Sequence, residues 1–185
     1  MAYTKTTWVN DTTPAINATN LNNMEDGIAD AHDKKPYVVK YSQATGTQTL
    51  NSTTTIVVNL DSEVYSDANY SLASDIVTLS AAGTYLVIFQ VTTNTSGNVA
   101  TQRLGWAAWV EYEPSGGGGY TRIDQLYAAR YWREAADMTT CNGTGIYVAT
   151  AGDKLRLCCA HTAAASAAWE LQQNLSSLSC LLLEP

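Results

Sequence analysis

Residues 83–93, with the sequence GTYLVIFQVTT, decide the fold because they predict a strand with apolar side chains on both faces. The odd positions from Tyr85 to Val91 are apolar on one face, and Leu86 and Ile88 occupy the other. One face of such a strand packs on the core of a two-layer sandwich, so the other face needs a third layer. We expect a neighbouring subunit to supply that layer; a locally folded loop is the alternative.

The last predicted strand, Leu178–Leu183, repeats this two-sided pattern. Leu181 and Leu183 lie on the face opposite Leu178, Cys180 and Leu182. The sequence predicts no helix that is available to cover the outer face of both strands. The two strands together therefore predict an obligate oligomer.

The rest of the second part of the chain alternates short strand patterns with turn residues. The predicted strands are Tyr37–Ser42, Thr53–Leu60, Ile76–Leu79, Gly83–Thr93, Gln102–Tyr112, Tyr120–Trp132, Gly145–Ala149, Lys154–Thr162 and Leu178–Leu183. No interval between them has room for a crossover helix, so a parallel βαβ arrangement is not expected. The sequence predicts an all-β, antiparallel sandwich or barrel.

A short amphipathic helix is predicted ahead of the strands. Asn17 can cap it, and Leu21, Met24 and Ile28 follow at the spacing of a coiled-coil stripe. Gly27 weakens this helix by about 1 kcal/mol relative to alanine, so the helix needs partners along its stripe. The stripe packs either against other copies or against its own domain. We place the boundary between residues 1–35, an anchoring segment, and residues 36–185, a head domain.

Charge and composition exclude several function classes. The 185 residues carry a formal net charge of −7, which repels a phosphate backbone and disfavours nucleic-acid binding. No apolar run resembles a secretory signal or a membrane span, so we expect folding in a cytoplasm and no membrane insertion. The spacing of Cys141, Cys158, Cys159 and Cys180 fits no zinc pattern. The reducing conditions of a cytoplasm favour free, buried thiols over disulfides.

No motif for catalysis, metal binding or a cofactor occurs, and we predict none of them. His161 and Cys159 share a strand face, but a core thiol beside a histidine explains the pair as well as a catalytic dyad does. Trp109 and Tyr120 are candidate ligand contacts, since exposed aromatic side chains are frequent at interfaces and sugar sites. Tyr127 and Tyr131, which we place on the same face as Ile123, are expected at subunit contacts.

The segment around the predicted helix resembles a motif found near the N-termini of bacteriophage tail, baseplate and head fibre proteins. The resemblance covers residues 7–31 and rests on TWVND at residues 7–11, TPAINA at residues 13–18 and MEDGI at residues 24–28. In those proteins the motif precedes a trimerising module close to the virion attachment point. The resemblance implies that Trp8, Pro14 and Ile16 anchor the chain to a virion.

The second part resembles the jelly-roll heads of the tumour necrosis factor and complement-type superfamily, which also form phage fibre tips. The landmarks are LSAAGTYLV at residues 79–87, TAGDKL at residues 150–155 and the closing strand Leu178–Leu183. The resemblance implies a jelly roll in which the strand after Gly83 and the last strand line a threefold axis.

Residues and resemblance together predict a homotrimer with no enzymatic activity, assembled in a host cytoplasm and carried on a virion. It would be a fibre or spike knob, in a head fibre, a capsid decoration or a tail fibre, that contacts other virion proteins and a host-surface glycan or receptor. The predicted trimer contacts are Leu21, Met24, Ile28, Tyr85, Leu86, Ile88, Tyr127, Tyr131, Leu178, Cys180 and Leu182. The alternatives are a polysaccharide-degrading spike enzyme, for which Glu111 and Asp124 are available, and a lectin-like glycan-binding module.

Overall fold

The computed structural model describes residues 18–33, 38–46, 48–50, 53–65, 69–94, 105–131, 138–162 and 169–184. The chain divides into two compact units, Met1–Pro36 and Tyr37–Pro185. The first unit contains helix α1 (Ala18–Asp33), which covers the predicted amphipathic segment. No helix in the described part of the chain combines the length and apolarity needed to cross a membrane.

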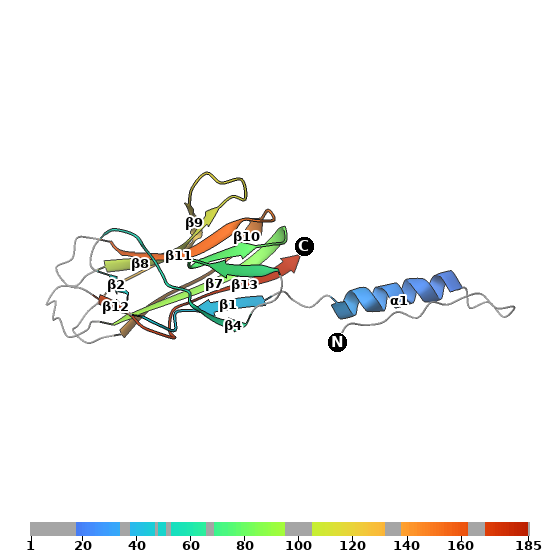
Figure 1. Cartoon of the computed structure of the whole chain (residues 1–185), viewed down its shortest axis with the longest axis horizontal. Helices are drawn as coiled ribbons and strands as arrows, with labels where there is room; N and C mark the ends of the chain where they lie inside the picture. The colour runs from blue at the N-terminus through green and yellow to red at the C-terminus, as the bar shows by residue number, and fades with distance from the viewer. Residues whose placement is uncertain are drawn as a thin grey trace. The chain divides into compact units, whose positions relative to one another are not determined.

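The second unit, which we call the head, is built from antiparallel strands. They are β1 (Val38–Ser42), β2 (Thr49–Leu50), β3 (Ile56–Val57), β4 (Ser62–Tyr65), β5 (Tyr70–Ala73), β6 (Ile76–Leu79), β7 (Gly83–Asn94), β8 (Gly105–Glu113), β9 (Thr121–Tyr131), β10 (Met138–Ala149), β11 (Lys154–His161), β12 (Trp169–Leu171) and β13 (Ser177–Glu184). Among the described residues they form a seven-stranded sheet in the order β2-β12-β7-β13-β1-β4, with β10 on β7. A six-stranded sheet runs β5-β6-β11-β8-β9, with β3 on β11. The predicted antiparallel sandwich is confirmed (Figure 1).

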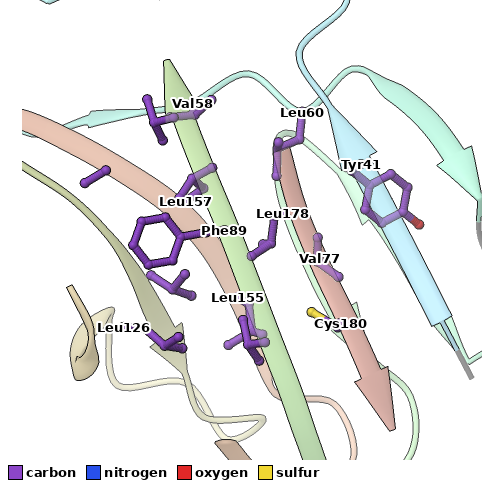
Figure 2. Packing of buried hydrophobic residues seen from close by; sticks show 14 of the residues in the cluster. Tyr41, Val58, Leu60, Val77, Phe89, Leu126, Leu155, Leu157, Leu178 and Cys180 are labelled. Atoms are coloured by element: carbon purple, nitrogen blue, oxygen red, sulfur yellow. The ribbon is translucent and has the colours of Figure 1, made fainter. Parts of the chain in front are cut away.

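The core lies between the two sheets and is contributed by alternate residues of each strand. Figure 2 shows Phe89 of β7 between the sheets with Leu155 and Leu157 of β11, and all three side chains are fully buried. Burying a side chain of this size stabilises the fold by about 1.5 to 3 kcal/mol. The two-residue period of these strands therefore sets which face of each sheet points inward.

Strand β10 is much longer than the prediction of Gly145–Ala149. It pairs with β7 along its whole length, from Met138 opposite Asn94 to Ala149 opposite Gly83. Its first half lacks an apolar alternation, which is why the sequence pattern does not mark it. Gly143 lies so close to the ring of Phe89 that a Cβ atom there would overlap the ring. The missing side chain thus lets the longest ladder of the head form against a large core residue.

Candidate functional site

The outer face of the seven-stranded sheet carries an apolar patch across three adjacent strands. Ile146 of β10 lies opposite Leu86 of β7, and Leu86 lies opposite Leu181 of β13. The flanking members of the patch are exposed: Ile88, Val148 and Leu183. We call these six residues the apolar patch. None of the outward-facing side chains is charged in the parts of these strands that carry the patch, which are residues 84–90 of β7, 142–148 of β10 and 177–183 of β13.

The predicted trimer contacts separate into two groups on these strands. Leu86 and Ile88 belong to the outward apolar patch, as the two-sided pattern predicted. The prediction also placed Tyr85, Leu178, Cys180 and Leu182 at trimer contacts. That prediction was wrong, because these side chains are at most 5% exposed and lie in the core of their own head. A side chain enclosed by its own domain has no surface to offer a partner. On β13 the outward residues are instead Leu181 and Leu183.

The helix presents part of its predicted stripe to solvent. Met24 is 62% and Ile28 is 49% exposed, while Leu21 is half-buried. The predicted virion-anchoring residues Trp8, Pro14 and Ile16 lie outside the described residues. The helix therefore retains an apolar side that could contact another copy.

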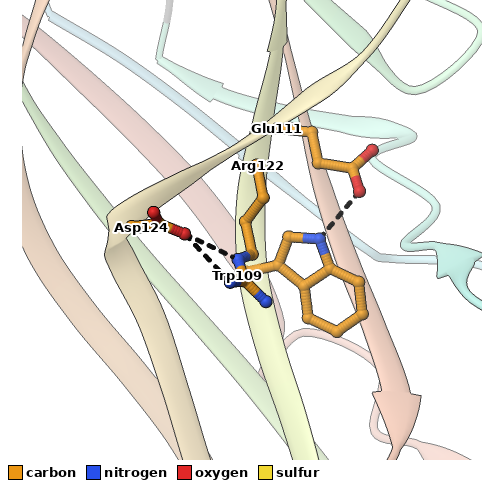
Figure 3. Close-up of polar contacts among 4 residues, drawn as sticks. All are labelled: Trp109, Glu111, Arg122 and Asp124. Atoms are coloured by element: carbon orange, nitrogen blue, oxygen red, sulfur yellow. Dashed lines mark hydrogen bonds and ion pairs between the residues drawn. The ribbon is translucent and has the colours of Figure 1, made fainter.

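The outer face of the six-stranded sheet is organised around Glu111 of β8. Its carboxylate accepts a hydrogen bond from Trp109 Nε1 at 2.8 Å (Figure 3). It also pairs with the Arg156 guanidinium of β11 at 2.6 Å. Burial raises the pKa of Glu111, but these hydrogen bonds and the arginine outweigh it and leave the pKa below its ordinary value. Glu111 thus stays ionised, as a structural anion rather than a proton donor.

Trp109, one of the two candidate ligand contacts, is only 9% exposed, so the expectation of an exposed ring was wrong. It packs with Val57, Ala107, Cys158 and Ala160 in a small apolar cluster on the outer face. The second candidate, Tyr120, has the Arg156 guanidinium 3.7 Å from its ring centroid. Its phenol oxygen is buried, and this burial, with Glu113 nearby, raises the pKa of Tyr120. Neither ring has a free face on which a ligand could stack.

An irregularity in β9 changes the side to which its tyrosines point. Tyr127 pairs with Trp109 whereas Arg122 pairs with Glu111, so four residues of β9 lie opposite Val110 alone. Ile123 and Leu126 are therefore both buried, and Tyr127 and Tyr131 are exposed on the outer face. The prediction that these tyrosines share a face with Ile123 was wrong, because such a bulge shifts the alternation of the strand.

His161 and the four cysteines are all buried. His161 is 3% exposed, its Nε2 lies 3.0 Å from the Leu50 carbonyl oxygen, and its ring stacks on Trp169. All four cysteines are buried and form no disulfide bond, as predicted. Burial raises the pKa of the Cys141 and Cys180 thiols to about 12. Neither the histidine nor these thiols offers an accessible nucleophile.

Asp153 holds together one end of the sandwich. Its carboxylate accepts hydrogen bonds from the Tyr147 hydroxyl at 2.7 Å, the Thr150 amide at 2.9 Å and the Ser115 amide at 2.9 Å. The aspartate thus joins its own turn to the glycine-rich loop between β8 and β9. Its carboxylate oxygens are used within the protein, and no cluster of three metal-ligating side chains occurs among the described residues.

Comparisons with known proteins give matches among solved structures alone. No protein-family model matches the chain, and no curated protein matches it. Among solved structures, the Eiger TNF of S. frugiperda matches with 16% identity and a TM-score of 0.57, over 80% of this chain and 94% of that chain. Murine APRIL matches with 17% identity and a TM-score of 0.59, over 80% of this chain and 100% of its own. The head has a TNF-like jelly-roll fold.

Proposed function

We propose that this chain forms a homotrimer of jelly-roll heads on a bacteriophage particle, attached through residues 1–35 and used for contact with a host surface. It would be a head fibre, a capsid decoration or a tail-fibre knob, assembled in the host cytoplasm and not an enzyme. The observation that carries the proposal is the apolar patch on the seven-stranded sheet.

The apolar patch favours a protein partner over water. Monomeric proteins seldom leave a contiguous apolar face of several large side chains uncovered, and Val148 alone is 74% exposed. A threefold ring buries such a face by packing it against a different surface of the next copy. Val64 and Tyr65 of the edge strand β4, exposed by 58% and 57%, supply an apolar surface of that kind.

The helix supports the same symmetry. Its exposed Met24 and Ile28 lie one turn apart, which suits packing between three parallel helices. A helix of 16 residues with an internal glycine is marginal alone. We therefore assign most of the association energy to the heads and a guiding role to the helix.

The placement on a virion rests on the resemblance of residues 7–31 to phage fibre N-termini. The formal charge of −7 agrees with a protein that is displayed in many copies and does not bind nucleic acid. The partners we propose for the N-terminal segment are other virion proteins of the capsid or the tail.

The mass in solution tests the assembly. Light scattering of the full chain should give the mass of three chains, and a version lacking residues 1–35 should remain trimeric with weaker association. Monomers in both forms, at micromolar concentration, would show that the trimer does not exist. Negative-stain electron microscopy of labelled particles then tests the position on the virion. Absence of this protein from the particles would contradict the proposed virion location.

A polysaccharide-degrading enzyme is the second candidate, with Glu111 and Asp124 as its carboxylates. Each of them is paired with an arginine, Glu111 with Arg156 and Asp124 with Arg122. The lowered pKa of Glu111 is the opposite of what a general acid needs. Glycan hydrolysis that is abolished by Glu111→Gln would favour the enzyme over the attachment protein.

A further inference from the structure

The two exposed tyrosines of β9 lie on the six-stranded sheet, which is the sheet that does not carry the apolar patch. Tyr131 is 72% exposed, and its ring lies across Gly105 of β8. A Cβ atom at residue 105 would be 3.3 Å from Tyr131 Cε1 and would overlap the Thr162 hydroxyl. The absence of a side chain at Gly105 therefore lets the tyrosine ring lie close to the backbone of β8, with a hydroxyl beside it.

The second ring lies four residues earlier on the same side of the strand. Tyr127 is 40% exposed, and Ala129 between the two tyrosines lies opposite Ala107. At about 3.3 Å per residue, the backbone positions of the two tyrosines are roughly 13 Å apart. The short alanine side chains leave the surface between the rings low. The arrangement suits an extended ligand that meets two aromatic rings in succession.

Polar groups of opposite charge border this surface. Arg122 and Asp124 form an ion pair at 2.9 Å in which the side chains are 50% and 85% exposed, and the Arg122 guanidinium lies 4.9 Å from the Tyr127 ring centroid. Glu111, which lies opposite Arg122 on the neighbouring strand, forms a second ion pair with Arg156. The charges cancel within each of these two pairs, so the pairs offer hydrogen bonds without selecting an anion or a cation.

The tyrosines also lie towards the end of the head that is remote from the entry of the chain. The chain enters at Val38, which pairs with Leu181, and Leu181 pairs with Leu86 near the start of β7. Ala149, opposite Gly83, ends β10 at that same end and leads through a short turn into β11. Tyr131 and Gly105 lie beyond the opposite end of β11, where Thr162 follows His161. A trimer formed through the other sheet would leave this surface open.

We propose that the surface formed by Tyr127, Tyr131, Thr162, Arg122 and Asp124 binds a neutral oligosaccharide. A pyranose ring presents an apolar C–H face, which stacks on a tyrosine, and hydroxyl groups at its rim, which hydrogen-bond to the hydroxyl, carboxylate and guanidinium. This inference deepens the proposed attachment function and rests on it. It names the ligand class and assigns contact to Tyr127 and Tyr131 instead of to Trp109 and Tyr120.

The experiment measures binding of the intact chain to immobilised glycans. The panel contains neutral oligosaccharides of glucose, galactose and mannose, and acidic ones carrying sialic or uronic acids. Positive ligands are then titrated by calorimetry against the variants Tyr131→Ala, Tyr127→Ala and Tyr131→Phe. Met138→Ala, which removes a 54% exposed apolar side chain at the start of β10, is the matched control. Light scattering of every variant reports whether it stays assembled.

We expect binding to neutral glycans that weakens about tenfold in each alanine variant and is retained in Tyr131→Phe and in the control. Absence of binding to every neutral glycan overturns the inference, as does binding that neither alanine variant changes. Binding to acidic glycans alone overturns the ligand class. If glycan binding fails while the trimer and its position on particles hold, only this inference is lost. Monomers that still bind would instead contradict the proposed trimer.

Discussion

The outer faces of the two sheets have opposite characters. The six-stranded sheet pairs its charges across strands, with Glu113 bound to Lys154 and Glu111 bound to Arg156. Glu111 also accepts a hydrogen bond from Trp109, which belongs to a small buried cluster on this face. The seven-stranded sheet exposes the apolar patch, in which Ile146, Leu86 and Leu181 lie side by side on three adjacent strands. One outer face has its charged groups paired within the chain and the other exposes uncharged apolar side chains, although both belong to the same sandwich.

The largest expected effect comes from placing charge in the apolar patch. Ile88→Asp combined with Val148→Asp should reduce the solution mass from that of three chains to that of one. An unpaired carboxylate buried at a contact costs on the order of several kcal/mol, and the trimer would contain six of them. Ser71→Asp, on an exposed position of β5, is the matched control and should leave the mass unchanged. A double variant that remains trimeric would place the contact elsewhere.

Removing the central anion of the other face should act on folding and not on assembly. Glu111→Ala leaves Arg156 half-buried without its partner and Trp109 Nε1 without its acceptor. We expect a loss of about 1 to 2 kcal/mol in the free energy of unfolding, reduced from the fully buried case by solvent screening. Urea denaturation measures it, with Glu63→Ala as the control. An unchanged midpoint would mean that this network contributes nothing to stability.

His161, between the two sheets, should make stability depend on pH. Burial lowers its pKa from the ordinary value of 6.5, and the hydrogen bond to Leu50 opposes this only in part. Since the unfolded chain then binds the proton more readily, the stability contributed by neutral His161 is complete above about pH 6.5. It is lost as the pH falls from there towards the lowered pKa.

Urea midpoints at about pH 7.5 and about pH 5.5 check this expectation. The native chain should lose more stability between the two than His161→Gln, which keeps a donor for the Leu50 carbonyl but does not titrate in this range. Equal losses in both proteins would assign the acid sensitivity to carboxylates instead.

The smallest effect is expected at the exposed ion pair of β9. Arg122→Ala should change the free energy of unfolding by less than about 0.5 kcal/mol, because both side chains of the pair are largely in solvent. The same denaturation assay measures it, with Arg156→Ala as the larger reference change. A loss as large as that of Arg156→Ala would show that Arg122 holds the bulge in place.

Sequence reasoning identified the strands and their alternation more reliably than it identified which face of each strand is buried. The alternation in residues 83–93 separates the face with Phe89 from the face with Leu86 and Ile88, but it does not say which face is buried, and the prediction placed Tyr85 at a subunit contact. The same reasoning could not choose which face of Leu178–Leu183 points inward, since both are apolar. The register of β13 against β7 makes that choice, placing Leu182 beside buried Tyr85 and Leu181 beside Leu86.

Strand β9 shows more clearly which features could not be predicted from the sequence. A strict two-residue period places Tyr127 on the face of Ile123, but the bulge opposite Val110 reverses it. No turn residue marks this bulge within β9; the nearest signal is that Leu126, three residues after Ile123, also needs burial. The closeness of Tyr131 to Gly105 could not be predicted either, because it depends on a pairing between strands.

The sequence by itself determined the antiparallel β class, the short amphipathic helix and the buried thiols. It also determined that an apolar strand face exists beyond the one that packs in the core. Those properties follow from local alternation and composition, which act over a few residues. The tertiary structure decided which side chains form that face and which tyrosines reach solvent. Strand register and bulges are set by pairing between distant segments, such as β7 with β13 and β8 with β9, and no local pattern encodes them.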